Sequence, residues 1–154
     1  MKKISFTHTS VPEAGEGKRG EKGHIGYLLR QAYASHRTRM EQALRETGLT
    51  LPQFSILTML AAYPNASGAE LARLSLLTPQ TMSVIVANLE RAGFVVRTPH
   101  KVHGRIQQIR ITADGAEILS RCKLLVQSVE QCLQTELSDQ DEALVRRWLV
   151  NVAK

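Results

Sequence analysis

Hydroxyl residues that begin helices recur along this chain and divide its middle into short helical segments. Thr50-Leu-Pro-Gln53 and Ser67-Gly-Ala-Glu70 each place Gln or Glu three residues after the hydroxyl, the pattern of a capping box. Thr78 precedes a proline, a residue that suits the first position of a helix. We therefore expect helices over about 51–63, from Ser67 with Leu71 and Leu74 directed inward, and from Thr78 to near Gly93.

Longer helices are expected on both sides of this region. Apolar residues recur at helical spacing from Ile25 until Gly48, which predicts a first helix over about 24–47. Thr112 begins a second long helix, about 113–136, and Ser138-Asp-Gln-Asp141 resembles a capping box that opens a last one. These helices are apolar, and one chain offers little to cover them, so we expect a second copy to do so.

A basic hairpin is expected between the short and the long helices. The β-branched segment after Gly93 and the alternating segment Ile106–Thr112 predict two strands, with Ile109 and Ile111 on one face and Arg110 on the other. Residues 1–23 lack periodicity and are read as an N-terminal arm or tail, whereas 24–154 form one domain. The expected fold class is mainly α with a small β-hairpin, an α+β winged helix-turn-helix.

The helix after Thr78 has two unlike faces. Met82, Ile85, Val86 and Leu89 form a core stripe at helical spacing. Small side chains and amides suit a face that enters a DNA major groove, because Gln and Asn pair with adenine and apolar groups contact the thymine methyl. The alternatives are an ordinary surface helix with few charges or a helix buried on both sides. The residues expected to face the major groove are Gln80, Thr81, Ser83, Val84, Ala87, Asn88 and Arg91.

Positive charge is concentrated next to that face. The chain carries a formal net charge of +6. Residues 91–110 hold five basic residues and no acidic one, whereas 113–154 hold seven acidic and five basic residues. A local basic patch indicates a polyanionic partner, which favours double-stranded DNA. The residues expected to contact the DNA backbone from the hairpin are Arg97, Lys101, His103 and Arg105.

Residues 49–115 resemble the MarR family of bacterial winged-helix transcription regulators. The resemblance rests on "LTLPQFSILTML", "SGAELARLSLLTPQTMSVIVANLERAGFVVR" and "GRIQQIRITADG", and the flanking helices extend it to about 24–152. It implies a homodimer built by 24–48 and 113–154, with 49–112 as the winged helix-turn-helix lobe. It also implies a palindromic operator, the helix after Thr78 in the major groove and the hairpin tip in the minor groove.

The chain departs from the family pattern in two places. His103 stands where the family's hairpin tip often has Asp, although Arg105 is retained. The positions of Val84 and Asn88 often carry Arg in the family, and their replacement favours A·T-rich sites. Family members are often released from DNA by small aromatic or anionic effectors or by thiol oxidation. The resemblance implies an effector pocket between the dimerisation helices and the lobe, which His36 and Arg39 could line; the alternative for His36 is a hydrogen-bonded core histidine.

Other kinds of site are less well supported. His100 and His103 could ligate a metal, but no Cys, Asp or Glu lies near them in sequence, so we expect a solvated pair and no metal or cofactor. Cys122 and Cys132 lie too far apart along one helix for a disulfide and are expected to be buried core thiols. No motif of nucleophilic, metal-dependent or phosphate-cradling enzymes occurs, so no enzyme is expected.

The function expected is a sequence-specific DNA-binding transcriptional regulator, acting as an effector-responsive repressor. The alternatives are a thiol- or metal-responsive sensor of the same fold and an interaction module with incidental DNA binding. No run of 18 or more apolar residues occurs, so no membrane span is expected. The N-terminus MKKISFTHTS lacks the apolar run of a secretory signal, which favours the cytoplasm.

Overall fold

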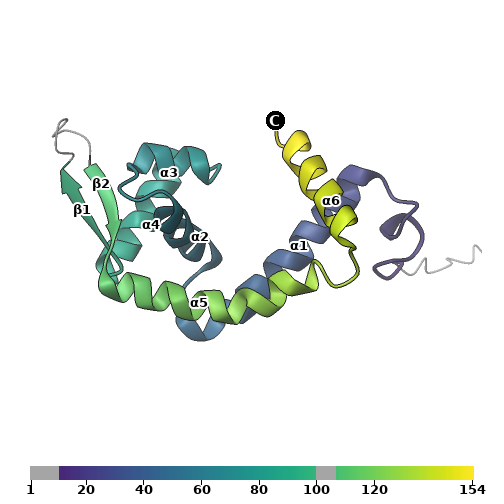
Figure 1. Ribbon diagram of the computed structural model, residues 1–154, viewed down its shortest axis with the longest axis horizontal. Helices are drawn as coiled ribbons and strands as arrows, with labels where there is room; N and C mark the ends of the chain where they lie inside the picture. The colour runs from purple at the N-terminus through teal and green to yellow at the C-terminus, as the bar shows by residue number, and fades with distance from the viewer. Residues whose placement is uncertain (1–10, 100–106) are drawn as a thin grey trace, which may run out of the picture. The chain divides into compact units, whose positions relative to one another are not determined.

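The computed structural model describes residues 11–99 and 107–154 (Figure 1). Their order is helix, helix, helix, helix, two-stranded hairpin, helix, helix, which confirms the expected fold class. The elements are η1 (Gly17–Arg19), α1 (Ile25–Leu44), η2 (Arg45–Thr47), α2 (Leu51–Ala62), α3 (Gly68–Leu74), α4 (Pro79–Arg91), β1 (Val95–Pro99), β2 (Gln107–Ile111), α5 (Ala113–Cys132) and α6 (Asp139–Val152).

The chain divides into two compact units, one up to Thr38 and one from Arg39 onward. In the described part of the first unit, the residues before α1 are tied to that helix. The Arg19 guanidinium donates to the Pro12 carbonyl at 2.6 Å and to Gln31 Oε1 at 3.3 Å. The Gln31 amide in turn donates to the Arg19 carbonyl at 3.1 Å. The segment expected to be an arm therefore has local structure of its own from residue 11 onward.

The helix-start signals act as the sequence predicts. The capping boxes at Thr50 and Ser67 have both reciprocal hydrogen bonds, and the Thr78 hydroxyl accepts from the Thr81 amide. Thr112 and Ser138 likewise accept from the amide three residues later. The first long helix ends in a 3-10 turn at Gly48, whose φ of 74° lies in the left-handed region that glycine tolerates.

The core of the second unit joins the end of α1, α2, α3, α4, the hairpin and α5 as far as Val126. The predicted stripe of α4 is confirmed, since Met82, Ile85, Val86 and Leu89 are all buried. Leu71 is fully buried, but Leu74 is 40% exposed, so its predicted inward direction is wrong. Leu74 is the last residue of α3, and Ser75 already leaves the helical path as the C-cap.

The hairpin pairs β1 and β2 in antiparallel register, with Val95 opposite Ile111 and Arg97 opposite Ile109. Ile109 is buried and Arg110 exposed, as the alternation predicts. The loop between α2 and α3 pairs with β2 through an isolated bridge, in which the Ile109 amide donates to the Ala66 carbonyl at 3.0 Å. This bond fixes the base of the hairpin against the lobe.

The later helices leave much apolar surface uncovered. The buried residues of α5 end at Val126, and none of the residues of α6 is buried. Cys122 is buried, but Cys132 is exposed, so the prediction of two buried thiols is wrong for Cys132. That residue lies beyond the part of α5 that the lobe covers. Within the described ranges, no helix is both long and apolar enough to cross a membrane.

Candidate nucleic-acid interface

Helix α4 presents the predicted face to solvent. Thr78 caps the helix, and the buried stripe holds one side of it in the core, so the opposite side must point outward. Gln80, Thr81, Ser83, Val84 and Arg91 are exposed, whereas Ala87 and Asn88 are half-buried. Val84 is an isolated valine with 61% of its surface exposed. A helix buried on both sides is therefore excluded.

Two side chains of this face are tied to each other. The Arg91 guanidinium donates a hydrogen bond to Asn88 Oδ1 at 3.1 Å. A bidentate contact with adenine needs the amide oxygen as acceptor and the amide nitrogen as donor. Arg91 uses one of the two lone pairs of that oxygen, so Asn88 can still accept through the other and donate through its amide nitrogen. Gln80 lies two residues after the cap, in the first turn of α4, and its side chain is exposed.

The turn between α3 and α4 contains an unusual residue. Leu76 has φ of 54°, in the left-handed region, and its side chain is 92% exposed. The next residue, Leu77, packs against the core, and its amide donates to the Ala72 carbonyl at 2.9 Å. The turn thus directs the start of α4 outward. Sequence reasoning missed Leu76, since leucine gives no signal for a positive φ.

The hairpin carries four residues that were expected to contact the DNA backbone. Only Arg97 lies in the described part of the chain, and its Nε lies 3.1 Å from Glu90 Oε2 on α4. Sequence reasoning missed Glu90, because nothing in the linear pattern pairs it with a residue of the next strand. Lys101, His103 and Arg105, together with His100, lie outside the described residues.

The end of α4 is joined closely to the start of α5. The Phe94 amide donates to the Leu89 carbonyl at 2.9 Å, and the Thr112 hydroxyl donates to the Gly93 carbonyl at 2.7 Å. Gly115 packs so tightly that a Cβ there would lie 2.0 Å from the Phe94 carbonyl oxygen. The orientation of α4 is therefore fixed by α5 as well as by the core.

The residues expected near an effector lie on α1, where His36 is half-buried and Arg39 is exposed. A hollow of about 1030 Å³ lies elsewhere, on the lobe, and neither residue lines it. Its walls come from the loop between α2 and α3, from α3 and from β2, and include Tyr63, Arg73 and Gln108. Sequence reasoning did not predict this hollow.

The buried thiol has the properties of a core residue. Burial raises the pKa of Cys122, and this effect outweighs the opposing ones of a hydrogen bond with Thr47 and of the Arg121 charge. A thiol with a raised pKa holds little thiolate at neutral pH, so it reacts slowly with oxidants and alkylating agents. This environment does not favour a redox sensor at Cys122.

Comparisons with known proteins agree with the geometry of the lobe. A model of the MarR family matches residues 47–106. The HTH-type transcriptional repressor Rv2887 of Mycobacterium tuberculosis is 35% identical over 125 residues, which cover 81% of this chain and 90% of that protein. A solved structure of the transcriptional repressor CouR bound to a 23-mer DNA duplex is similar with a TM-score of 0.79 and 26% identity, covering 90% of this chain and 96% of CouR.

A structure of a mutant MarR from Escherichia coli, complexed with operator DNA, is similar with a TM-score of 0.77 and 22% identity. The similarity covers 84% of this chain and 94% of the MarR chain. The relatives span almost the same length as this chain, and the match includes the helices on both sides of the lobe. The resemblance noted in the sequence is thereby confirmed, and the chain belongs to the MarR family of transcription regulators.

Proposed function

We propose that this protein binds a palindromic operator as a homodimer and represses transcription by occluding the promoter. The observation that carries the proposal is the outward face of α4, where exposed amide, hydroxyl and small apolar groups replace the usual acidic residues. Such a face fits the major groove without repelling phosphate. CouR and the Escherichia coli MarR mutant are similar proteins solved with DNA, which supports the proposal.

Each part of the α4 face has a role in this proposal. Gln80 and Asn88 read base edges, Val84 and Ala87 contact thymine methyl groups, and Thr81, Ser83 and Arg91 contact the backbone or the groove edge. The hairpin tip, with Lys101, His103 and Arg105, contacts the minor groove and its phosphates. The absence of Arg at Val84 and Asn88 favours operators rich in A·T pairs.

The protein acts through binding rather than catalysis, and we place it in the cytoplasm with the chromosome. A small aromatic or anionic effector that binds near His36 and Arg39 alters the spacing of the two recognition helices of the dimer. A change in that spacing breaks the match with half-sites one helical turn apart, so affinity for the operator falls.

Genomic footprinting with the purified protein tests the proposal and supplies the operator. Binding to that duplex should fall steeply with salt and exceed binding to a scrambled duplex, whereas a non-DNA module shows neither property. Gln80→Ala or Asn88→Ala should change the preferred bases, at a cost of about 1–3 kcal/mol at particular positions. Gln127→Ala, an exposed glutamine on α5, is the matched control. Equal weakening on all duplexes would contradict a base-reading role.

A further inference from the structure

We propose that Arg97 positions the hairpin against α4 through Glu90, rather than contacting DNA itself. The inference rests on the proposed function, because the hairpin has to be placed against an operator. It assigns Glu90 and Arg97 one shared role. It also reverses the interpretation of Arg97 that its charge alone suggests.

The register of the hairpin places Arg97 on its inner face. Side chains alternate along a strand, so Arg97 lies on the same face as Val95, which is buried at the start of β1. The residue directly opposite Arg97 is Ile109, which is also buried. Val96 and its partner Arg110 are exposed on the other face. The Arg97 side chain thus leaves the strand on the side that packs against the lobe.

Glu90 lies within hydrogen-bonding distance of the Arg97 guanidinium. On the helical wheel of α4 it lies roughly a quarter turn from the centre of the groove-facing side, between that side and the core stripe. Its Oε2 accepts a hydrogen bond from Arg97 Nε at 3.1 Å, and the two side chains are 42% and 36% exposed. Glu90 is the one acidic residue within α4.

The pair adds a second attachment between helix and strand. The first is the backbone bond from the Phe94 amide to the Leu89 carbonyl, next to Gly93 with its φ of 78°. The hydrogen bond of the Ile109 amide with the Ala66 carbonyl fixes the base of the hairpin against the lobe. The contact of Arg97 with Glu90 lies further along β1 and adds a side-chain contact with α4, which limits movement of the hairpin beyond that base. It also neutralises a carboxylate that would otherwise face the phosphates from the flank of α4.

The two roles of Arg97 predict opposite effects of one substitution. If Arg97 contacts phosphate, Glu90→Gln removes a competing acid, so operator binding becomes tighter. If Arg97 positions the hairpin, Glu90→Gln loosens it, so binding weakens although the protein has lost a negative charge. We expect Glu90→Gln and Arg97→Gln each to weaken operator binding by about two- to fivefold, a range typical of a half-exposed ion pair.

Two further variants test the coupling. The double variant should bind about as well as either single one, because both remove the same contact. Exchanging the charges, with Glu90→Arg and Arg97→Glu together, should restore binding to within about twofold, since the contact re-forms. If Arg97 instead contacts phosphate, the exchanged protein should bind the operator more weakly than wild type. In that case Arg97→Gln should also lower the magnitude of the salt slope by about 0.9.

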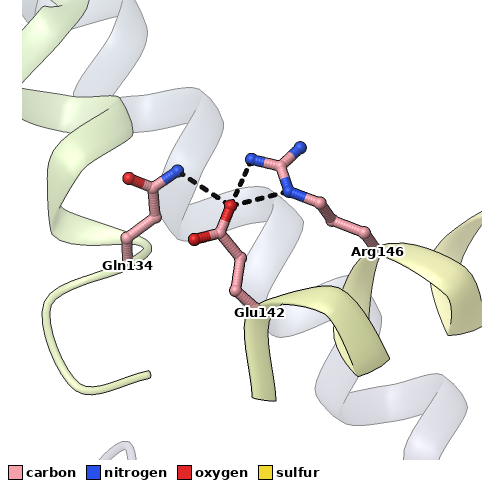
Figure 2. A network of polar contacts seen from close by, with 3 residues as sticks. All are labelled: Gln134, Glu142 and Arg146. Atoms are coloured by element: carbon pink, nitrogen blue, oxygen red, sulfur yellow. Dashed lines mark hydrogen bonds and ion pairs between the residues drawn. The ribbon is translucent and has the colours of Figure 1, made fainter. Parts of the chain in front are cut away.

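Glu142→Gln is a matched control, since it removes the same charge from another ion pair. On α6, Glu142 accepts from Arg146 at 2.6 Å, and it also accepts at 3.4 Å from the amide of Gln134, which lies between α5 and α6 (Figure 2). Because α6 belongs to the helices expected to form the dimer, sedimentation should first show that this variant stays dimeric, and its operator affinity should then equal that of the wild-type protein. The ratio of operator to scrambled-duplex affinity should fall for Glu90→Gln but not for the control, which separates positioning from a general loss of stability.

Hydrogen exchange of the β1 amides without DNA gives an independent measurement. Exchange should be faster in Glu90→Gln and Arg97→Gln than in the wild-type protein and the control. Operator binding by Glu90→Gln that equals or exceeds wild type, with unchanged exchange, would overturn the positioning role. A wild-type protein without operator preference would instead overturn the proposed function, so the two failures are distinguishable.

Discussion

Leu76 has a backbone conformation that costs a leucine free energy. Its φ of 54° brings the Cβ close to the backbone, and its 92% exposed side chain regains nothing by burial. Left-handed conformations cost L-residues about 1–2 kcal/mol, a cost that glycine avoids. The greater freedom of glycine in the unfolded chain offsets part of the stability that a glycine here would gain. Leu76→Gly should therefore raise the free energy of unfolding by up to about 1 kcal/mol, measured by urea denaturation.

Leu71→Ala is the control for that measurement, because Leu71 is fully buried in the same helix-turn-helix. It should lower the free energy of unfolding by about 2–5 kcal/mol. A clear loss of stability in Leu76→Gly would mean that the exposed leucine makes a contact that outweighs the strain, such as one with a second chain.

Cys122 allows a chemical test of the core. Because burial raises the pKa of this thiol, the folded state holds its proton more tightly than the unfolded chain does. In a Cys132→Ser protein at pH 8, Ellman's reagent should therefore label no thiol until urea unfolds the chain. Prompt labelling of the native variant would contradict the burial of Cys122.

The same raised pKa has a consequence for stability at high pH. The stabilisation is present below the pKa of the unfolded thiol, about 8.5, and is lost as pH rises through the higher folded value. The urea midpoint of the Cys132→Ser protein should thus fall more steeply above about pH 8.5 than that of a variant that also carries Cys122→Ala.

Single residues mark the limit of what the sequence predicts. The stripe of α4 followed from spacing alone, because a helix must bury one side. The pairing of Arg97 with Glu90 did not, because it depends on which face of β1 meets α4. Cys132 looked like a core residue by the same spacing that correctly placed Cys122. Spacing gives the apolar face of a helix, but not the point at which the lobe stops covering it.

At the scale of elements, local chemistry predicted the starts of helices best. Thr50, Ser67, Thr78, Thr112 and Ser138 all cap a helix, because each hydroxyl satisfies an amide that the helix leaves without a partner. Helix ends were less exact, since they depend on tertiary contacts. The expected end of α5 near 136 is Cys132 in the structure.

The junction of α4, β1 and α5 depends on a glycine that has no room for a side chain. A Cβ on Gly115 would meet the Phe94 carbonyl oxygen at 2.0 Å and the Ile111 Cγ2 at 2.9 Å. Gly115→Ala must therefore push α5 away from the hairpin, and it should lower the free energy of unfolding by about 1–3 kcal/mol. Because α5 also fixes the orientation of α4, operator affinity should fall as well.

Gly26→Ala is the matched control for the junction, since a Cβ on Gly26 of α1 meets nothing within 4 Å. Alanine is the better helix former by about 1 kcal/mol, so this variant should be at least as stable as wild type. Thermal and urea denaturation of both proteins give the comparison. Equal stability of Gly115→Ala and wild type would mean that the junction can relax without cost.

At the scale of the whole molecule, the uncovered apolar surface needs an explanation. The described part of α6 buries no residue, yet Leu144, Trp148, Leu149 and Val152 are among its large exposed side chains. Leu124, Leu125, Leu133 and Leu137 add to this surface on and after α5. A helix gains most of its stability from burying an apolar face, so α6 has little reason to persist in a lone chain.

The last prediction follows from that surface and concerns an obligate dimer. If a second copy covers α6, folding and association are one process, and the melting temperature should rise with protein concentration. Trp148→Asp with Leu149→Asp places two charges in the interface, so it should yield unfolded or aggregating chains rather than a stable monomer.

Tyr63→Asp is the control, because Tyr63 is 53% exposed on the lobe and should leave the dimer intact. Sedimentation equilibrium from micromolar concentration downward measures the association. A wild-type monomer that remains folded there, with a melting temperature independent of concentration, would rule out the obligate dimer, and the two recognition helices would then have to reach a palindrome as separate chains.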